Sequence, residues 1–154
     1  MRLIAAALLL AGLALPAGGP TGFYHWPTSQ LHGFAKILAP RAAKLHVATE
    51  SLGAHGNYTF SGLYRNASGE AEWHQKIADI LVFQTGTGTV LVGGEMEKPR
   101  DTGAGEKRGA GIRGGTEVKV GPGDIVTVPP ATPHQVILRP NEHEITYFAV
   151  KVIQ

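Results

Sequence analysis

Three side chains that commonly bind metal ions lie close together in the middle of the chain. Glu72 and His74 are two residues apart, and in a β-strand this spacing places both side chains on one face. Asp79 follows after a short turn, at the start of the next expected strand. Neighbouring strands bring their Cβ atoms to about 4.5–5.5 Å, so an imidazole and a carboxylate can share one ion. The spacing therefore predicts converging metal ligands.

The composition limits the chemistry that the chain can perform. Its 154 residues contain no cysteine, which excludes disulfides, thiolate nucleophiles and Cys-ligated zinc. Any metal must be held by His and carboxylate, and no Gly-x-Ser-x-Gly elbow is present for a serine nucleophile. A net charge of only +2, from 14 basic and 12 acidic residues, argues against a nucleic-acid partner.

The elements expected to position these side chains are strands. The 21 glycines and 10 prolines make the chain too turn-rich for a helical bundle, and 43% hydrophobic residues suffice for one core. After Leu45, short β-prone runs alternate with Gly, Pro and Asn, which is typical of a sandwich or barrel. We predict an all-β domain over residues 45–154, with strands at 45–50, 57–65, 71–75, 79–84, 88–92, 116–120, 124–128, 134–139 and 145–152.

The first residues have the pattern of an export signal. Arg2 precedes a charge-free apolar run over residues 3–15, and small residues and prolines follow. The run is shorter than the roughly 20 residues that a membrane span needs. We predict a signal peptide over residues 1–17, cleaved near Ala14 or Ala17, and a periplasmic or secreted protein with no stable membrane anchor. The alternatives are an uncleaved anchor and a buried N-terminal helix.

Two further segments are expected outside the regular strands. Residues 18–44 form an N-terminal extension with one short helix, because Leu31, Phe34, Ile37 and Leu38 fall on one side and Thr28 or Ser29 precedes them as a cap. Residues 95–115 carry six glycines among many charges, which predicts a mobile loop over one end of the barrel. That loop is either a lid or a solvated connection.

Two motifs resemble those of the cupin superfamily. Residues 123–134, GDIVTVPPATPH, resemble the second cupin motif, in which Gly, five residues, Pro, a small residue and His recur. Residues 74–86 are similar to the later part of the first motif, with Asp79 where the family usually has Glu. The resemblance covers about residues 55–150. It implies a jelly-roll barrel, also called a double-stranded β-helix.

The resemblance adds His134 to the candidate metal ligands His74, Asp79 and Glu72, and Glu72 stands where the family usually has His. Two His and one carboxylate leave coordination positions open. Such a set suits non-haem Fe(II) and also accepts Mn, Zn, Ni or Co. Two alternatives stay open: the barrel has lost its metal, or Asp79 accepts backbone hydrogen bonds at a turn and Glu72 is the carboxylate ligand.

Other positions bear on the site less directly. Ala131 replaces the usual Gly, which is harmless if the turn there can be made with negative φ. Leu138 shares a strand face with His134, which predicts a more apolar cavity. The remaining histidines match no ligand pattern and are predicted to be surface or packing residues; they are His25, His32, His46, His55 and His143.

These observations favour an exported cupin that binds a divalent metal and a small, partly apolar ligand inside its barrel. The resemblance allows a metal-dependent oxygenase, isomerase or lyase, and fold alone does not choose among them. One alternative is a metal-free module that binds a small molecule. Another is a structural protein that forms a homodimer through Phe148, Val150 and Val152, which share one face of the last expected strand.

Overall fold

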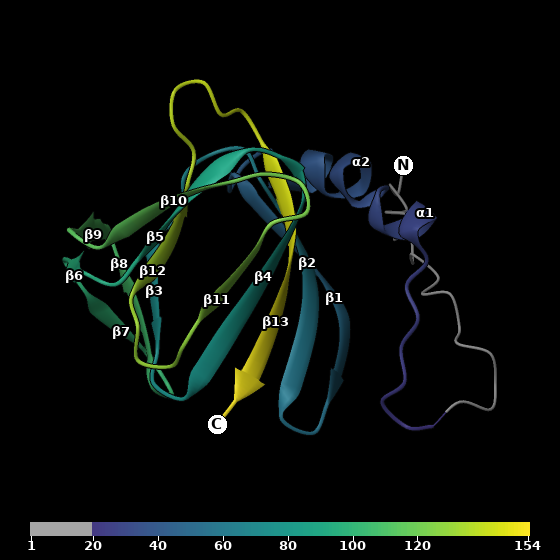
Figure 1. The fold of residues 1–154 in the computed structure, drawn as a ribbon, viewed down its shortest axis with the longest axis horizontal. Helices are drawn as coiled ribbons and strands as arrows, with labels where there is room; N and C mark the ends of the chain where they lie inside the picture. The colour runs from purple at the N-terminus through teal and green to yellow at the C-terminus, as the bar shows by residue number, and fades with distance from the viewer. Residues whose placement is uncertain (1–19) are drawn as a thin grey trace, which may run out of the picture.

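A computed structural model of the protein describes residues 20–154. The predicted signal peptide, residues 1–17, lies outside the described residues. Two antiparallel sheets dominate the rest (Figure 1). The first has the strand order β1 (Val47–His55), β2 (Tyr58–Arg65), β13 (Ile145–Ile153), β4 (Ile77–Gly86) and β11 (Ile125–Val128).

The second sheet carries the candidate motifs on its central strands. Its order is β10 (Thr116–Val120), β5 (Gly88–Val92), β12 (His134–Ile137), β3 (Ala71–His74), β8 (Glu106–Gly109) and β7 (Arg100–Gly103). A small ribbon of β6 (Glu95–Glu97) and β9 (Gly111–Arg113) lies beside it (Figure 1). The prediction of an all-β jelly-roll barrel is confirmed.

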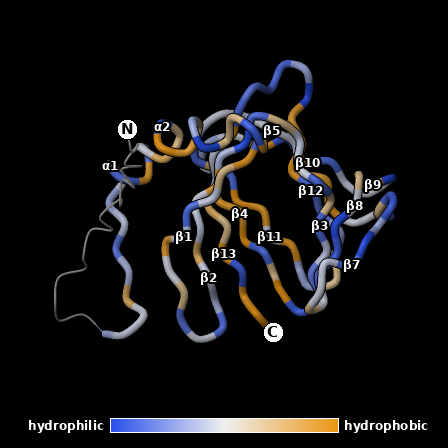
Figure 2. Tube along the Cα trace, turned by 180° about the vertical axis from the view of Figure 1, so that it is seen from behind, coloured by the Kyte–Doolittle hydropathy of each residue, from blue (hydrophilic) through white to orange (hydrophobic). Residues whose placement is uncertain are grey.

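The main core lies between the two sheets. Phe83 and Ile145 from the first sheet and Val90 from the second are fully buried in one hydrophobic cluster. Figure 2 shows the hydrophobic stretches concentrated on β4, β11 and β13, whereas β7 is hydrophilic. Burial of this apolar surface is the main stabilising contribution to the barrel.

The N-terminal extension covers the outer face of the first sheet. It contains α1 (Thr28–Leu31), α2 (Phe34–Leu38) and the 3-10 turn η1 (Ala39–Ala42). Phe34 packs edge-on against Phe148, with ring centroids 5.9 Å apart. Phe148 is therefore a core residue beneath the helices, and only 4% of its surface is exposed.

The helical prediction was right about Phe34 and Leu38, which are buried, and wrong in two details. One helix was expected, but Gly33 separates two short ones. Neither Thr28 nor Ser29 caps the start, because Pro27 takes the N-cap position and no side chain bonds there. Within residues 20–154, no helix has the length and apolar character that a membrane span requires.

The prediction of a mobile loop over residues 95–115 is wrong. The segment forms the four short strands β6 to β9, and β8 pairs with β3 so that His74 lies opposite Glu106 and Glu72 lies opposite Arg108. Glycines with positive φ, such as Gly103 and Gly105, occupy the turn between β7 and β8. The glycines thus serve tight turns.

The turn before β12 holds Ala131 in the left-handed region, with a φ of +56°. The condition under which Ala would replace Gly there without cost, a negative φ, is not met. The backbone N–H of Ala131 donates to the carbonyl of His74 over 2.7 Å. This hydrogen bond ties the second motif to the first.

Candidate metal centre and adjoining cavity

The two sheets bring the four predicted ligands together. Glu72 and His74 come from β3, and His134 on β12 lies directly opposite Glu72 in the antiparallel register. Asp79 projects from β4 in the facing sheet. One ligand atom from each of the four residues lies within 4.8 Å of the others. The convergence expected from the sequence is therefore present.

Both histidines present the same ring nitrogen to the group. His134 Nδ1 lies 3.1 Å from the carbonyl oxygen of Thr132, and His74 Nδ1 contacts the Glu106 carboxylate. The Nε2 atoms of His134 and His74 lie 3.1 and 3.4 Å from Oδ2 of Asp79. Holding Nδ1–H on an oxygen leaves Nε2 free to bind a metal, the usual arrangement around protein metal ions.

Asp79 lies at the centre of the group and is 3% exposed. Burial alone would raise its pKa, but hydrogen bonds from His134 and His74 and the charge of Lys151 lower the pKa well below its ordinary value. Its carboxylate is bonded by side chains of the site. This contradicts the alternative in which Asp79 accepts backbone hydrogen bonds at a turn.

Glu72 connects the centre to the space outside it. Its Oε2 lies 3.4 Å from both His74 Nε2 and an amino group of Arg108, and its Oε1 lies 3.8 Å from an amino group of Arg65. Although burial raises its pKa, the hydrogen bond with His74 and the charges of Arg108 and Lys151 lower it to about 2. Glu72 is therefore ionised at neutral pH.

Lys151 is a member of the site that the sequence analysis did not identify. It lies on β13, and its Nζ is 2.7 Å from Asp79 Oδ2 and 2.9 Å from His74 Nε2. The available signal was a lone lysine in the apolar run of residues 148–153. Its side chain is 31% exposed, so it reaches the centre from the solvent side.

The protonation of His74 depends on these neighbours. Burial and the charge of Lys151 lower its pKa, but hydrogen bonds to Asp79 and Glu72 prevail and raise it to about 9. An ammonium only donates, so the contact between Lys151 and His74 is a hydrogen bond only when the ring is neutral. A divalent ion would supply the positive charge that the carboxylates attract and would favour the neutral ring.

The volume of a small cavity at the candidate metal centre indicates whether an ion fits among these residues. Its volume is about 40 Å³, and Glu72, Asp79, His134 and Lys151 contribute to its wall. A site of about 10–15 Å³ already holds a water molecule. Two imidazoles and two carboxylates around such a space are suitable ligands for a divalent transition metal.

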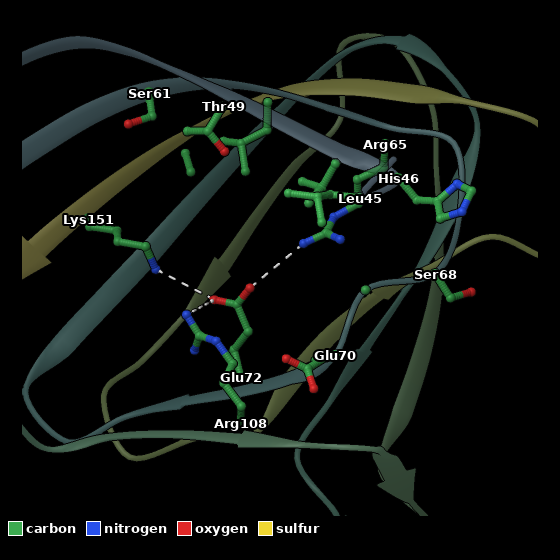
Figure 3. A pocket seen from close by; sticks show the side chains of 14 residues that line it. Leu45, His46, Thr49, Ser61, Arg65, Ser68, Glu70, Glu72, Arg108 and Lys151 are labelled. Atoms are coloured by element: carbon green, nitrogen blue, oxygen red, sulfur yellow. Dashed lines mark ion pairs between the residues drawn. The ribbon is translucent and has the colours of Figure 1, made fainter. Parts of the chain in front are cut away.

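A larger cavity of about 590 Å³ opens beside the centre (Figure 3). Figure 3 shows Arg65, Arg108 and Lys151 converging on Glu72 from different strands. Leu63 and Ala149 add apolar wall, and Thr49, Ser61 and Ser68 add hydroxyl groups. Leu138, from which an apolar cavity was expected, does not line this cavity and packs against the core instead.

The five other histidines, predicted to be surface or packing residues, are all exposed. Among them His46 lines the larger cavity, and its Nδ1 lies 2.9 Å from Oδ1 of Asn66. None belongs to the metal-ligand group of the described residues.

Comparison with solved structures defines the fold class. The chain is similar to a cupin 2 conserved barrel domain protein from Rhodopseudomonas palustris, with 19% identity and a TM-score of 0.50 over 69% of this chain and 60% of that one. A cupin-2 domain protein from Rhodospirillum rubrum has 16% identity and a TM-score of 0.51 over 71% and 61%. The TT1209 protein from Thermus thermophilus has 16% identity and a TM-score of 0.55 over 77% and 92%.

These likenesses establish a cupin fold. The chain spans about three fifths of the length of the first two proteins. No family model matches the chain. No curated protein matches it.

Proposed function

We propose that the protein binds a divalent transition metal through His74, His134 and Asp79, with Glu72 beside them, and acts on a small molecule in the adjoining cavity. The observation that carries the proposal is the position of Asp79 Oδ2, within 3.4 Å of both imidazole Nε2 atoms. Their Nδ1 atoms already contact oxygen atoms. Fe, Mn, Zn, Ni and Co all suit this ligand set.

A metal held by these residues would act as a Lewis acid toward an oxygen atom of the ligand. The chain's own groups would then orient that ligand. Glu72 faces the cavity with three cationic groups around it, and Lys151 places an ammonium at the boundary between the cavity and the centre. The apolar wall suits a partly apolar ligand, and an oxygenase, isomerase or lyase reaction would use these groups.

Metal analysis of protein purified without a histidine tag tests the proposal. We expect about one equivalent of metal for the wild type and strongly reduced metal for His74→Ala and His134→Ala. His143→Ala is the matched control, because His143 is exposed and outside the group. Stoichiometric metal in the double variant of His74 and His134 would contradict the proposal.

A second candidate is a metal-free module that binds a small molecule. The observation that favours it is the ammonium of Lys151, which lies 2.7 and 3.0 Å from the two oxygens of Asp79 and supplies positive charge without a metal. In this case the wild type would hold no metal after saturation with Zn²⁺ or Mn²⁺ and dialysis. Retention of one equivalent excludes it.

We also propose that the protein is exported and that residues 1–17 are removed. The support is the apolar run after Arg2 and the small residues that end it. Intact-mass measurement of the protein from the periplasm or medium tests this. Recovery of the full-length chain in a membrane fraction would contradict it.

A further inference from the structure

Arg65, at the end of β2, is a buried arginine with free hydrogen-bond donors. It is 8% exposed, and its Nε–H donates to the hydroxyl of Tyr147 over 2.8 Å. Among the described residues this is the one hydrogen bond of its side chain. Glu72, the nearest carboxylate, lies 3.8 Å away, beyond hydrogen-bond distance. Its two terminal amino groups, with four of the five N–H donors, therefore remain free.

The surroundings hold this guanidinium in place. Tyr147, which accepts the Nε–H bond, is 3% exposed and packs against Phe83 in the core. Gly69 leaves room for the guanidinium, since a Cβ at this position would lie 2.4 Å from Nη1 of Arg65. A guanidinium that is buried and held in place, and whose two terminal amino groups form no hydrogen bond, is well suited to bind a carboxylate. The two groups can form paired, charge-assisted hydrogen bonds.

The two terminal amino groups of Arg65 face the larger cavity. Arg65 is part of the wall, and Figure 3 shows its terminal nitrogens directed toward Glu72 and the cavity. Three cations, Arg65, Arg108 and Lys151, are balanced there by the carboxylates of Glu72, Asp79 and Glu106. A divalent ion would leave the region with excess positive charge when both histidines are neutral, and an anion would compensate it.

We propose that Arg65 binds the carboxylate of a small organic acid whose other end reaches the metal centre. The second half of this statement rests on the proposed metal-binding function. Glu72 indicates the length of the ligand, because one of its oxygens faces Arg65 and the other faces His74. Arg65 and the centre are therefore separated by little more than one carboxylate, and a short dicarboxylate or oxo acid spans them.

Calorimetric titration of the Zn²⁺-loaded protein with malonate, succinate and neutral malonamide tests the inference. We expect malonate to bind at least about tenfold more tightly than malonamide, since a hydrogen bond to a charged group contributes more than one to a neutral group. Arg65→Met should weaken malonate binding at least about tenfold. Arg139→Met is the matched control, because Arg139 is an exposed arginine paired with Glu117.

A second variant keeps the test informative if Arg65→Met does not fold. Gly69→Ala keeps the charge of Arg65 but displaces its amino group, so it should also weaken malonate binding while circular dichroism stays unchanged. Equal malonate affinity in wild type, Arg65→Met and Gly69→Ala, with zinc still bound, overturns the inference and leaves the metal proposal standing. Equal affinity for malonate and malonamide overturns it as well.

The same titration without metal separates the two proposals. If the wild type retains no zinc but still binds malonate in an Arg65-dependent way, the metal function fails and Arg65 remains the carboxylate anchor. If neither zinc nor malonate binds, both proposals are overturned.

Discussion

The ammonium nitrogen of Lys151 lies 2.7 Å from Oδ2 of Asp79, the oxygen that also faces the Nε2 atoms of both histidines. A metal ion bound by Asp79 and the histidines would share this oxygen with Lys151. Two cations that share one carboxylate oxygen repel each other, so we expect Lys151 to turn toward the solvent side when a metal binds. Lys151 therefore competes with the metal.

Replacing Lys151 with Met should increase the affinity for Zn²⁺, on the order of tenfold, because a like charge a few ångströms from the ion is removed. Competition titration with a chromophoric chelator measures the change. Lys119→Met, on the exposed strand β10, should leave the affinity unchanged. A lower affinity in Lys151→Met would show that the lysine supports the bound metal.

Asp79→Asn should weaken metal binding more than Glu72→Gln. Asp79 is almost fully buried between the two imidazoles, whereas Glu72 already has Arg65, Arg108 and Lys151 beside it. We expect a loss of at least about 10- to 100-fold for Asp79→Asn, the range found for residues that only support metal ligands. If Glu72→Gln weakens metal binding more than Asp79→Asn does, Glu72 is the carboxylate ligand and the prediction is wrong.

Glu106→Gln should weaken metal binding by about 10- to 100-fold without removing a ligand. Its carboxylate contacts Nδ1 of His74 and so fixes the orientation of that ring. Glu117→Gln, at an exposed acid on β10, is the matched control. Zinc titration that gives equal affinity for Glu106→Gln and the wild type would exclude this positioning role.

Ala131→Gly should stabilise the protein by about 0.5–1 kcal/mol. The left-handed conformation at φ +56° costs a non-glycine residue roughly 1–2 kcal/mol, and the greater freedom of Gly in the unfolded chain offsets part of the gain. Urea unfolding measures the difference. Ala54→Gly, at an exposed strand position without positive φ, should instead destabilise, and a stabilised Ala54→Gly would contradict the explanation.

The free energy of unfolding should fall at alkaline pH because of the ionisation of Tyr64. Its hydroxyl donates to Oε2 of Glu144 over 2.7 Å, and burial, this bond and the Glu144 charge raise its pKa from 10 to about 12. Unfolded chains ionise this tyrosine near pH 10 and the folded protein does so only near pH 12, so stability declines between these values.

Urea unfolding at several pH values up to about 12 checks this prediction. Burial also raises the pKa of Tyr147, so the informative quantity is the difference between the wild type and Tyr64→Phe. The decline should be smaller in Tyr64→Phe, and Glu144→Gln should reduce it in part. Identical declines in wild type and Tyr64→Phe would exclude a contribution from Tyr64.

Sequence patterns were sufficient to predict the barrel fold and the four residues that come together in the candidate metal centre. The alternation of β3 fixes Glu72 and His74 on one face, and the spacing around Asp79 and His134 matches motifs that place them opposite. Lys151, Arg65 and Glu106 were missed because their place in the site depends on long-range contacts. Lys151 and Asp79 are paired across neighbouring strands although they are 72 positions apart in sequence.

The glycine-rich segment shows the other limit of sequence reasoning. Its glycines and charges resemble those of a solvated loop, and only the pairing of β8 with β3 reveals that Glu106 and Arg108 face the site. Short strands with few apolar residues leave almost no periodic signal. The register that places them is a property of the folded sheet.

The pairing of β8 with β3 also has a consequence for solubility. Without residues 95–115, β3 would be an edge strand with one row of backbone donors and acceptors open to solvent, which invites pairing between molecules. The segment moves the edge outward to β7, which is fully exposed and carries Arg100 and Asp101. Charged edges resist such pairing. The same hairpin that supplies Glu106 therefore protects the protein against self-association through the strand that carries Glu72 and His74.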